Sequence, residues 1–271
     1  MGWLFNKIRR MLFIYSRMMA QNLKIKLEYK ADFVLMLFAG SFMQMLGILF
    51  LNILFSRIPD IQGWSLWEVL FVLSAIFFTE GVVSLLFEGM WSMSALVNTG
   101  EFDRFLLRPV SPVLQVISSN LGANGIGNII VGIVIFVQAL GKICIQWDLL
   151  HIFYLVLFIL SAITIRTSIS FAANSSAFWL KTISSSFPIM VHQLADLGKY
   201  PITIFSRSVQ FIITFIIPYA FIGYFPAVYL FGKNPQIAWI GWLCPAVAAA
   251  CVFVSRMIFY RGLKSYESPG N

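Results

Sequence analysis

Apolar residues in this chain fall in long, nearly uninterrupted runs that are separated by short polar segments. A run of about 20 apolar residues has the length that an α-helix needs to cross the hydrocarbon of a bilayer. The alternation at every second residue that a transmembrane β-barrel requires is not the pattern here. The runs therefore predict an all-α integral membrane protein with six transmembrane helices, at about residues 31–55, 66–88, 114–140, 149–171, 202–217 and 237–260.

The first 30 residues follow a different pattern, because apolar positions at helical spacing alternate with basic ones. This predicts that residues 1–30 form an amphipathic helix lying in the headgroup region. A soluble arm is the alternative, and it would leave Trp3, Phe5 and Phe13 in water.

The fifth apolar run continues past residue 217 but contains Pro218 and Pro226, with Gly223 between them. Each proline removes a backbone donor, so a straight helix through both would leave carbonyl groups unpaired in hydrocarbon. The chain is therefore expected to break and turn back over residues 218–231, as a re-entrant element after span five.

The composition agrees with a membrane protein: 59% of the residues are hydrophobic and 11% are charged, against about 25% charged in a typical soluble domain. The net charge of +8 comes from basic residues spread around the apolar runs, so no nucleic-acid partner is expected. Three cysteines and two histidines, distant from one another, predict neither a metal site nor a catalytic centre.

The distribution of lysine and arginine predicts the orientation. With six crossings, fourteen of these residues lie on the side of the N-terminus and only three, Arg57, Lys142 and Lys233, lie on the other side. Basic loops stay in the cytoplasm. The prediction is a multi-pass protein of the plasma (cytoplasmic) membrane with both termini in the cytoplasm and residues 261–271 as a cytoplasmic tail.

The loop after the second run contains a bracketed segment, Gly100 to Pro109, with acids at its start and arginines at its end. That charge order suits the dipole of a short helix. Phe102, Phe105 and Leu106 share one face, at the spacing of a helix that docks in a groove. A protein-docking helix at about residues 95–110 is the prediction, and an ordinary interfacial loop helix is the alternative.

The stretch GEFDRFLLRPVSP at residues 100–112 resembles the cytoplasmic motif between spans two and three of ABC-2 type exporter permeases, and most closely the subgroup with Gly, Asp and then Leu-Leu-Arg-Pro. Three later stretches are similar to motifs of the same subgroup: Tyr200-Pro201, the run from Ile217 to Ala227, and Tyr266 to Gly270. The resemblance covers nearly the whole chain. It implies a permease subunit of an ATP-driven exporter.

The same resemblance implies the partners and the roles of particular residues. ATP and Mg would be bound by a separate ATPase subunit and not by this chain, and a second permease subunit, identical or homologous, would complete the pathway in the lipid bilayer. The residues that couple to the ATPase would be Glu101, Phe102, Asp103, Arg104, Phe105 and Arg108. The outer gate would be formed by Pro218, Tyr219, Phe221, Tyr224, Phe225 and Pro226.

The glycine-rich stretch at residues 122–128 lacks the Lys-Ser/Thr of a phosphate-binding loop, so it favours close helix packing over nucleotide binding. Among the charged residues within the predicted spans, three are singled out by their depth: Glu80 lies about 18 Å from the outer side, Glu88 about 30 Å and Arg166 about 27 Å, at 1.5 Å per residue. Glu88 and Arg166 therefore either pair or reach separately to the inner headgroups. Glu80 lies nearest to the middle of the bilayer, where it either faces a pathway, faces the partner subunit or is protonated.

Two other classes of function remain as alternatives. An ATP-independent secondary transporter would show interrupted helices at matching places in two halves, and here only the fifth run is interrupted. An integral membrane enzyme would need His, Asp or Cys clustered at one depth. His192 and Asp196, four residues apart, are expected to make only a structural hydrogen bond.

Overall fold

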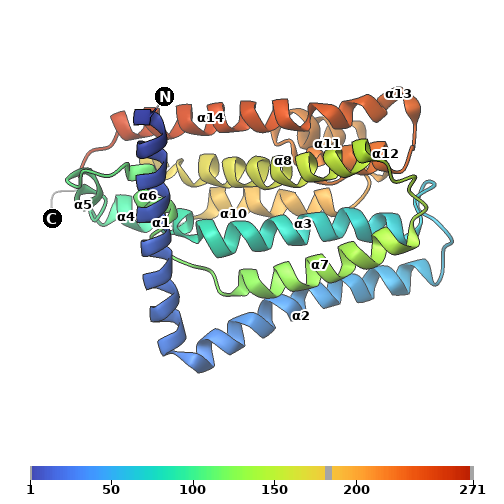
Figure 1. The fold of residues 1–271 in the computed structure, drawn as a ribbon, viewed down its shortest axis with the longest axis horizontal. Coiled ribbons are helices and arrows are strands. Elements are labelled where there is room, and N and C mark those ends of the chain that lie inside the picture. Colours follow the sequence, from blue (N-terminus) through green and yellow to red (C-terminus); the bar gives the residue numbers. More distant parts are fainter. Residues whose placement is uncertain (1, 181–184, 269–271) are drawn as a thin grey trace.

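The computed structural model describes residues 2–180 and 185–268, and these residues form an all-helical bundle (Figure 1). Within this part of the chain, five helices are long and apolar enough to cross a membrane. Three begin within one residue of the predicted start: α2 (Lys30–Phe55), α3 (Leu66–Phe87) and α8 (Leu149–Asn174). The fourth is α7 (Asn124–Lys142), and the last is the continuous stretch of α13 (Pro235–Ala238), η6 (Trp239–Leu243) and α14 (Cys244–Lys264).

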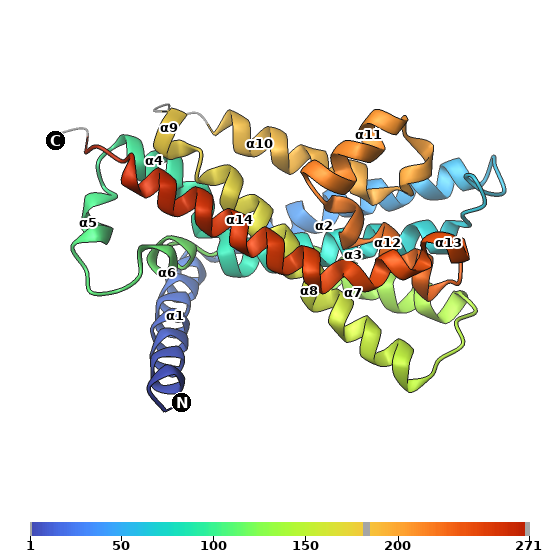
Figure 2. The same ribbon diagram turned by 90° about the horizontal axis from the view of Figure 1, so that it is seen from above.

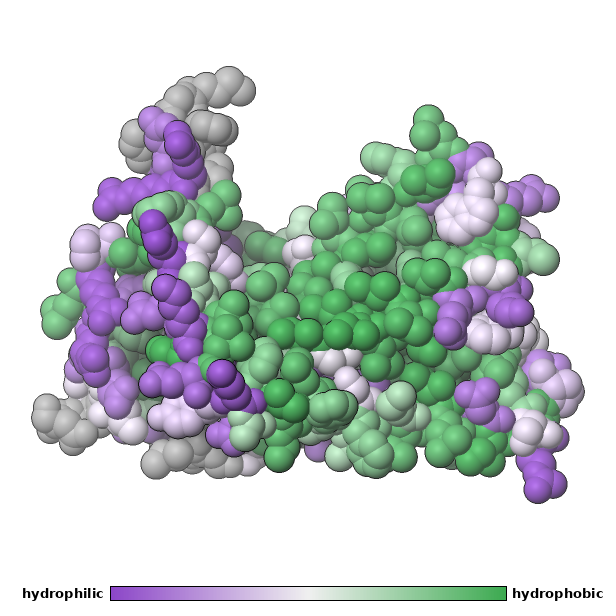
Figure 3. Space-filling view, turned by 60° about the horizontal axis from the view of Figure 1, so that its bottom comes forward, coloured by the Kyte–Doolittle hydropathy of each residue, from purple (hydrophilic) through white to green (hydrophobic). Residues whose placement is uncertain are grey.

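The surface has the polarity of a membrane protein. A wide apolar belt covers the middle of the bundle, and hydrophilic residues gather at its two ends (Figure 3). Many side chains in this belt are large and exposed, including Phe38 at 71% and Met43 at 70% on α2. Soluble monomers rarely expose so large an apolar surface to water. Together with the five apolar helices, this surface shows that the protein is a multi-pass membrane protein.

The N-terminal helix α1 (Gly2–Glu28) runs across one end of the bundle, nearly at right angles to the other long helices (Figures 1 and 2). Two hydrogen bonds fix it there: the Tyr15 hydroxyl donates to the Leu86 carbonyl at 2.5 Å, and the Asn22 amide donates to the Ser118 carbonyl at 2.8 Å. The N-terminus lies at the same end of the bundle as the C-terminal end of α14 (Figure 1). This crosswise position is the one that an interfacial helix requires.

Helix α7 packs closely on α3 through glycines. A β-carbon built on Gly125 would lie 2.5 Å from the carbonyl oxygen of Gly81, and one built on Gly81 would lie 2.6 Å from the carbonyl oxygen of Gly125. Only glycine permits so close an approach of two backbones. The prediction that the small residues at 122–128 serve helix packing is confirmed.

The predicted third span, 114–140, is wrong at its start. The chain forms a short helix α6 (Pro112–Ile117), breaks, and begins α7 only at Asn124. Residues such as Val116 are apolar because they are buried against the loop after α3, in one cluster with Met90 and Met93. Hydropathy does not distinguish a residue that faces this internal core from one that faces lipid.

The second and fourth spans extend beyond their predicted ends. Helix α3 continues through η1 (Glu88–Ser92) into α4 (Met93–Asn98), and α8 is followed by α9 (Ala177–Leu180). The extensions α4 and α9 pack against each other at the end of the bundle that carries both termini. They form the base on which the loop after α4 rests.

The predicted fifth span, 202–217, is not a long helix. It consists of η3 (Ile202–Ile204), α11 (Arg207–Phe211) and a π-helical turn (Ile212–Ile216), followed by η5 (Tyr219–Ile222) and α12 (Tyr224–Leu230). The preceding residues form α10 (Ser186–Gln193) and η2 (Leu194–Lys199), which pack on α8 and α3. The chain thus passes from the α9 end to the α13 end of the bundle in short pieces (Figure 2). Six long crossing helices are therefore not what the structure shows.

Candidate functional site

The loop between α4 and α6 is the first candidate site. Its helix α5 covers only Asp103–Leu106, which is shorter than the predicted bracketed helix. Gly100 adopts a left-handed conformation, φ +78°, where the chain turns out of α4. The side-chain amide of Gln115 donates to the carbonyl oxygens of Phe105 at 2.8 Å and Val110 at 2.9 Å, and so fixes the returning part of the loop to α6.

Phe102 does not present its ring to a partner. Its exposed fraction is 0%. The ring makes edge contacts with Phe178 and Tyr266, each at a centroid distance of 5.3 Å. The sequence interpretation placed Phe102 against a partner; in the structure the ring is buried and anchors the loop to α9 and to the C-terminal tail.

Asp103 is also engaged within the chain. One carboxylate oxygen accepts from the Tyr266 hydroxyl at 2.9 Å, and the other accepts from the Ser268 hydroxyl at 2.6 Å. Burial, and then the hydrogen bond to Asp103, raise the pKa of Tyr266 to about 12, so the hydroxyl remains a donor at neutral pH. The tail thus holds the loop through its motif residues, of which Pro269 and Gly270 lie outside the described residues.

The outward face of the loop consists of the other residues. Leu107 is 85% exposed, and Glu101, Arg104 and Arg108 are exposed around it. The guanidinium of Arg108 lies over the partly buried ring of Phe105, 5.9 Å from its centroid. We call Glu101, Arg104, Leu107 and Arg108 the loop face.

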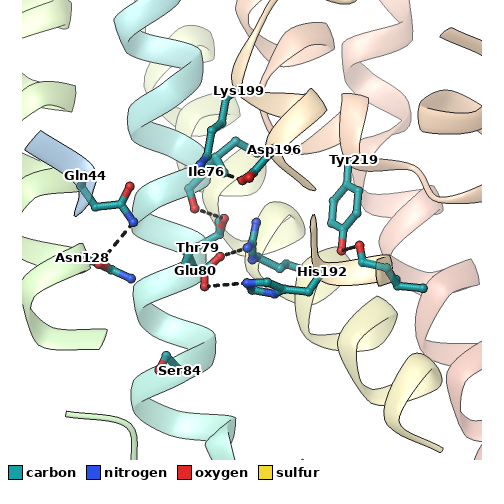
Figure 4. A network of polar contacts seen from close by, with 12 residues as sticks. Gln44, Ile76, Thr79, Glu80, Ser84, Asn128, His192, Asp196, Lys199 and Tyr219 are labelled. Atoms are coloured by element: carbon teal, nitrogen blue, oxygen red, sulfur yellow. Dashed lines mark hydrogen bonds and ion pairs between the residues drawn. The ribbon is translucent and has the colours of Figure 1, made fainter. Parts of the chain in front are cut away.

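The second candidate site lies between α3, α8 and α10. The Arg166 side chain, 2% exposed, forms an ion pair with Glu80, and His192 Nε2 lies 3.3 Å from the other carboxylate oxygen of Glu80 (Figure 4). Neither alternative for Arg166 is therefore found, since it pairs with Glu80 and not with Glu88, and its buried side chain does not reach the headgroups. Side chains in a helix lean toward its N-terminus, and the long arginine reaches back along α8 to the level of Glu80.

Glu88 has other partners at the end of α3. The Ser84 hydroxyl lies 2.9 Å from a Glu88 carboxylate oxygen and 3.1 Å from the side-chain oxygen of Asn124. These residues, together with the Glu80–Arg166 pair, line a polar cavity of about 170 Å³. The other lining residues are Val83, Trp91, Ser170 and His192. We call this cavity the membrane pocket.

His192 and Asp196 do not meet as expected. Asp196 pairs with Lys199 at 2.7 Å, while the His192 ring meets the edge of Trp91 at a centroid distance of 5.4 Å. Sequence reasoning missed the roles of His192, Trp91 and Gln115. The one available signal was that each is a polar or amphipathic residue in a segment that is otherwise apolar.

The predicted gate residues lie at the α13 end of the bundle and belong to its core. Tyr219, Phe221, Tyr224 and Phe225 are at most 5% exposed, Pro226 is buried and Pro218 is half-buried. The Tyr219 hydroxyl donates to the Val191 carbonyl at 3.2 Å, which ties the segment to α10. The aromatic rings of this region that face outward are Phe211, 56% exposed, and Phe215, 73% exposed.

A lysine fastens the same region to α3. Lys233 Nζ lies 3.0 Å from a Glu68 carboxylate oxygen, donates to the Gly63 carbonyl at 2.5 Å and lies over the Trp64 ring. Glu68 in turn accepts from the backbone N–H and the hydroxyl of Ser65 in a capping box at the start of α3. The loop after α2 and the end of α12 are thereby held together.

The chain matches a known family. A family model described as ABC-2 family transporter protein matches residues 41–270, from the middle of α2 to the C-terminal tail. No curated protein and no solved structure matches the chain. The matched range includes both the loop face and the membrane pocket.

Proposed function

Because the chain belongs to the ABC-2 family of transporter proteins, we propose that it is a permease subunit of an ATP-driven exporter. A second permease subunit, identical or homologous, completes the pathway, and separate ATPase subunits bind ATP and Mg. The observation that carries the coupling role is the clamping of the loop by Phe102 and Asp103, which leaves the loop face projecting from the bundle.

Clamping suits a loop that transmits force. The Phe102 ring is packed against Phe178 on α9 and against Tyr266 beyond α14, and Phe178 also contacts Phe259 of α14 at a centroid distance of 5.5 Å. A displacement of the loop face therefore moves the ends of two membrane helices instead of being absorbed by a flexible loop. An exposed leucine surrounded by charged residues matches the arrangement of an interface with an apolar centre and a polar rim.

The proposed orientation places the loop face and both termini in the cytoplasm. The short pieces between residues 186 and 217 make the sixth crossing, and residues 218–231 form the re-entrant element near the outer boundary. If Lys199 and Arg207 are moved to the outer side because of this course of the chain, twelve basic residues remain on the cytoplasmic side against five on the outer side. The cytoplasmic excess survives the correction.

Single cysteines on a background without the native three test this topology. Gln62→Cys and Asn234→Cys are expected to react with a membrane-impermeant maleimide in intact cells, since both positions are exposed at the α13 end. Glu101→Cys, exposed at the other end, is expected to react only after permeabilisation. Labelling of Glu101→Cys in intact cells would contradict both the orientation and the coupling role.

A substitution of Leu107, at the centre of the loop face, tests whether the ATPase docks there. Leu107→Asp is expected to weaken association with the ATPase by about 30-fold, the cost of about 2 kcal/mol that a central interface residue carries. Association is measured by pull-down of the ATPase subunit that co-purifies with the unchanged permease in detergent, with export assayed in proteoliposomes.

Leu149→Asp provides the matched control, because Leu149 is 84% exposed, against 85% for Leu107, and begins α8 at the opposite end of the bundle. This variant is expected to bind the ATPase as the unchanged protein does. Equal ATPase binding by the Leu107→Asp and Leu149→Asp variants would show that the loop face is not the docking site.

A further inference from the structure

The membrane pocket contains more polar groups than its ion pair needs, and its lining residues come from five helical elements: α3, η1, α7, α8 and α10. We propose that it binds the uncharged, hydroxyl-bearing head of an amphipathic cargo. This inference rests on the proposed exporter function, because it assigns a substrate class to the pathway of that exporter.

The first argument is an unsatisfied donor. Arg166 is 2% exposed, and its terminal nitrogen Nη2 forms the ion pair with Glu80. Its other terminal nitrogen, Nη1, is buried and has no hydrogen-bond partner among the described residues. A buried donor on a charged group is costly to leave unpaired. Arg166 is one of the residues that line the membrane pocket, so a small shift of its side chain would let Nη1 donate to an acceptor oxygen of a ligand there.

The second argument is the charge balance of the pocket. Glu80 offsets the charge of Arg166, and Glu88 adds a further carboxyl group that accepts from Ser84. An anionic head would meet both carboxyl groups, and a quaternary ammonium head would offer nothing to Arg166 Nη1. A hydroxyl group suits both partners, because it accepts from the guanidinium and donates to the carboxylate or to the Asn124 side-chain oxygen.

The third argument concerns the open side of the pocket. The His192 side chain is 36% exposed and stands edge-on against Trp91, which is half-buried at the pocket wall. Helix α10, which carries His192, also has exposed apolar side chains, namely Phe187, Ile189 and Met190. A polar head in the pocket and an apolar chain along this helix describe an amphipathic molecule.

The test measures binding to the full chain in phosphatidylcholine nanodiscs without the ATPase. The probe is tritiated octyl glucoside below its micellar concentration, and the competitors are octyl phosphate, octyltrimethylammonium and free glucose. Saturable binding of octyl glucoside, at least tenfold tighter than that of either charged octyl compound, is expected. Competition by free glucose as strong as by octyl glucoside would assign the site to a soluble sugar instead of an amphiphile, and would overturn the amphipathic part of the proposal.

Two substitutions on one helix locate the binding. Ser170 lines the pocket and is 7% exposed, so Ser170→Leu fills part of the pocket beside the Glu80–Arg166 pair while leaving both members of that pair in place. Ser168 is 6% exposed on the same helix and does not line the pocket, so Ser168→Leu is the matched control. The first is expected to weaken binding at least tenfold and the second less than threefold. Equal effects would place the ligand elsewhere and overturn the proposal.

If the Ser170→Leu variant does not fold, Trp91→Leu at the half-buried pocket wall replaces it in the measurement, and it is also expected to weaken binding at least tenfold. No preference among the three octyl probes in the unchanged protein would also overturn the proposal. Because the ATPase is absent from this measurement, failure of the loop-face experiment leaves the result unaffected, and failure of the binding leaves the docking proposal intact.

Discussion

Replacing Arg166 with leucine is expected to lower the free energy of unfolding by about 3–5 kcal/mol, because Glu80 then keeps a buried charge without its guanidinium partner. Arg166 is 2% exposed and the Glu80 side chain 21% exposed, so neither is well hydrated. The remaining contact of Glu80, with His192 at 3.3 Å, is longer and does not replace the ion pair. The measurement is an SDS titration of the folded fraction in detergent micelles.

Two further variants distinguish the loss of the ion-pair partner of Glu80 from the general effect of replacing an arginine with leucine. The double variant Glu80→Leu with Arg166→Leu is expected to recover most of the stability, since removing both members of a buried pair is often neutral. Arg256→Leu, at an exposed arginine on α14, is expected to change stability by no more than about 0.5 kcal/mol. Equal losses at Arg166 and Arg256 would mean that the ion pair does not hold α3 to α8.

The long helices could be predicted from the sequence because lipid imposes a simple requirement of about 20 apolar residues. The starts of α2, α3 and α8 were found for this reason. The start of α7 was not, because the apolar residues of α6 face a core within the protein. The short pieces at 186–217 were not predicted either, since the polar residues there, such as His192, are accommodated by partners inside the bundle instead of by water.

In the candidate sites, the residues could be picked out from the sequence, but their contacts with distant parts of the chain could not. The sequence singled out Glu80, Arg166 and the stretch around Asp103 because charges are rare in or beside apolar runs. Which charge meets which depends on the lean of side chains and on helix packing, so the pair of Arg166 with Glu80 was not among the alternatives for Arg166. Phe102 was assigned to a partner because the tail and α9, which bury it, are far away in the sequence.

Replacing Phe102 with alanine is expected to uncouple ATP hydrolysis from export, and the cause is internal to this chain. Truncation of a fully buried phenylalanine costs about 3–5 kcal/mol where the cavity cannot close. Here the lost ring separates the loop from Phe178 and Tyr266, with which it makes edge contacts at 5.3 Å. The measurement compares ATPase turnover with cargo export in proteoliposomes that contain the complete transporter.

Three comparison variants distinguish clamping from docking. Phe102→Leu keeps most of the buried volume and is expected to retain coupling. Tyr266→Phe keeps the ring contact but removes the hydroxyl that donates to Asp103, a bond of about 1.5–3 kcal/mol, and is expected to lower coupling in part. Phe153→Ala, at a phenylalanine that is 59% exposed on α8, is expected to leave coupling unchanged.

In contrast to Leu107→Asp, the Phe102→Ala variant should still bind the ATPase, because the loop face remains present but is no longer braced. Loss of ATPase binding in the Phe102→Ala variant while its thermal unfolding is unchanged would mean that the ring touches the partner directly, and the bracing role would then have to be abandoned.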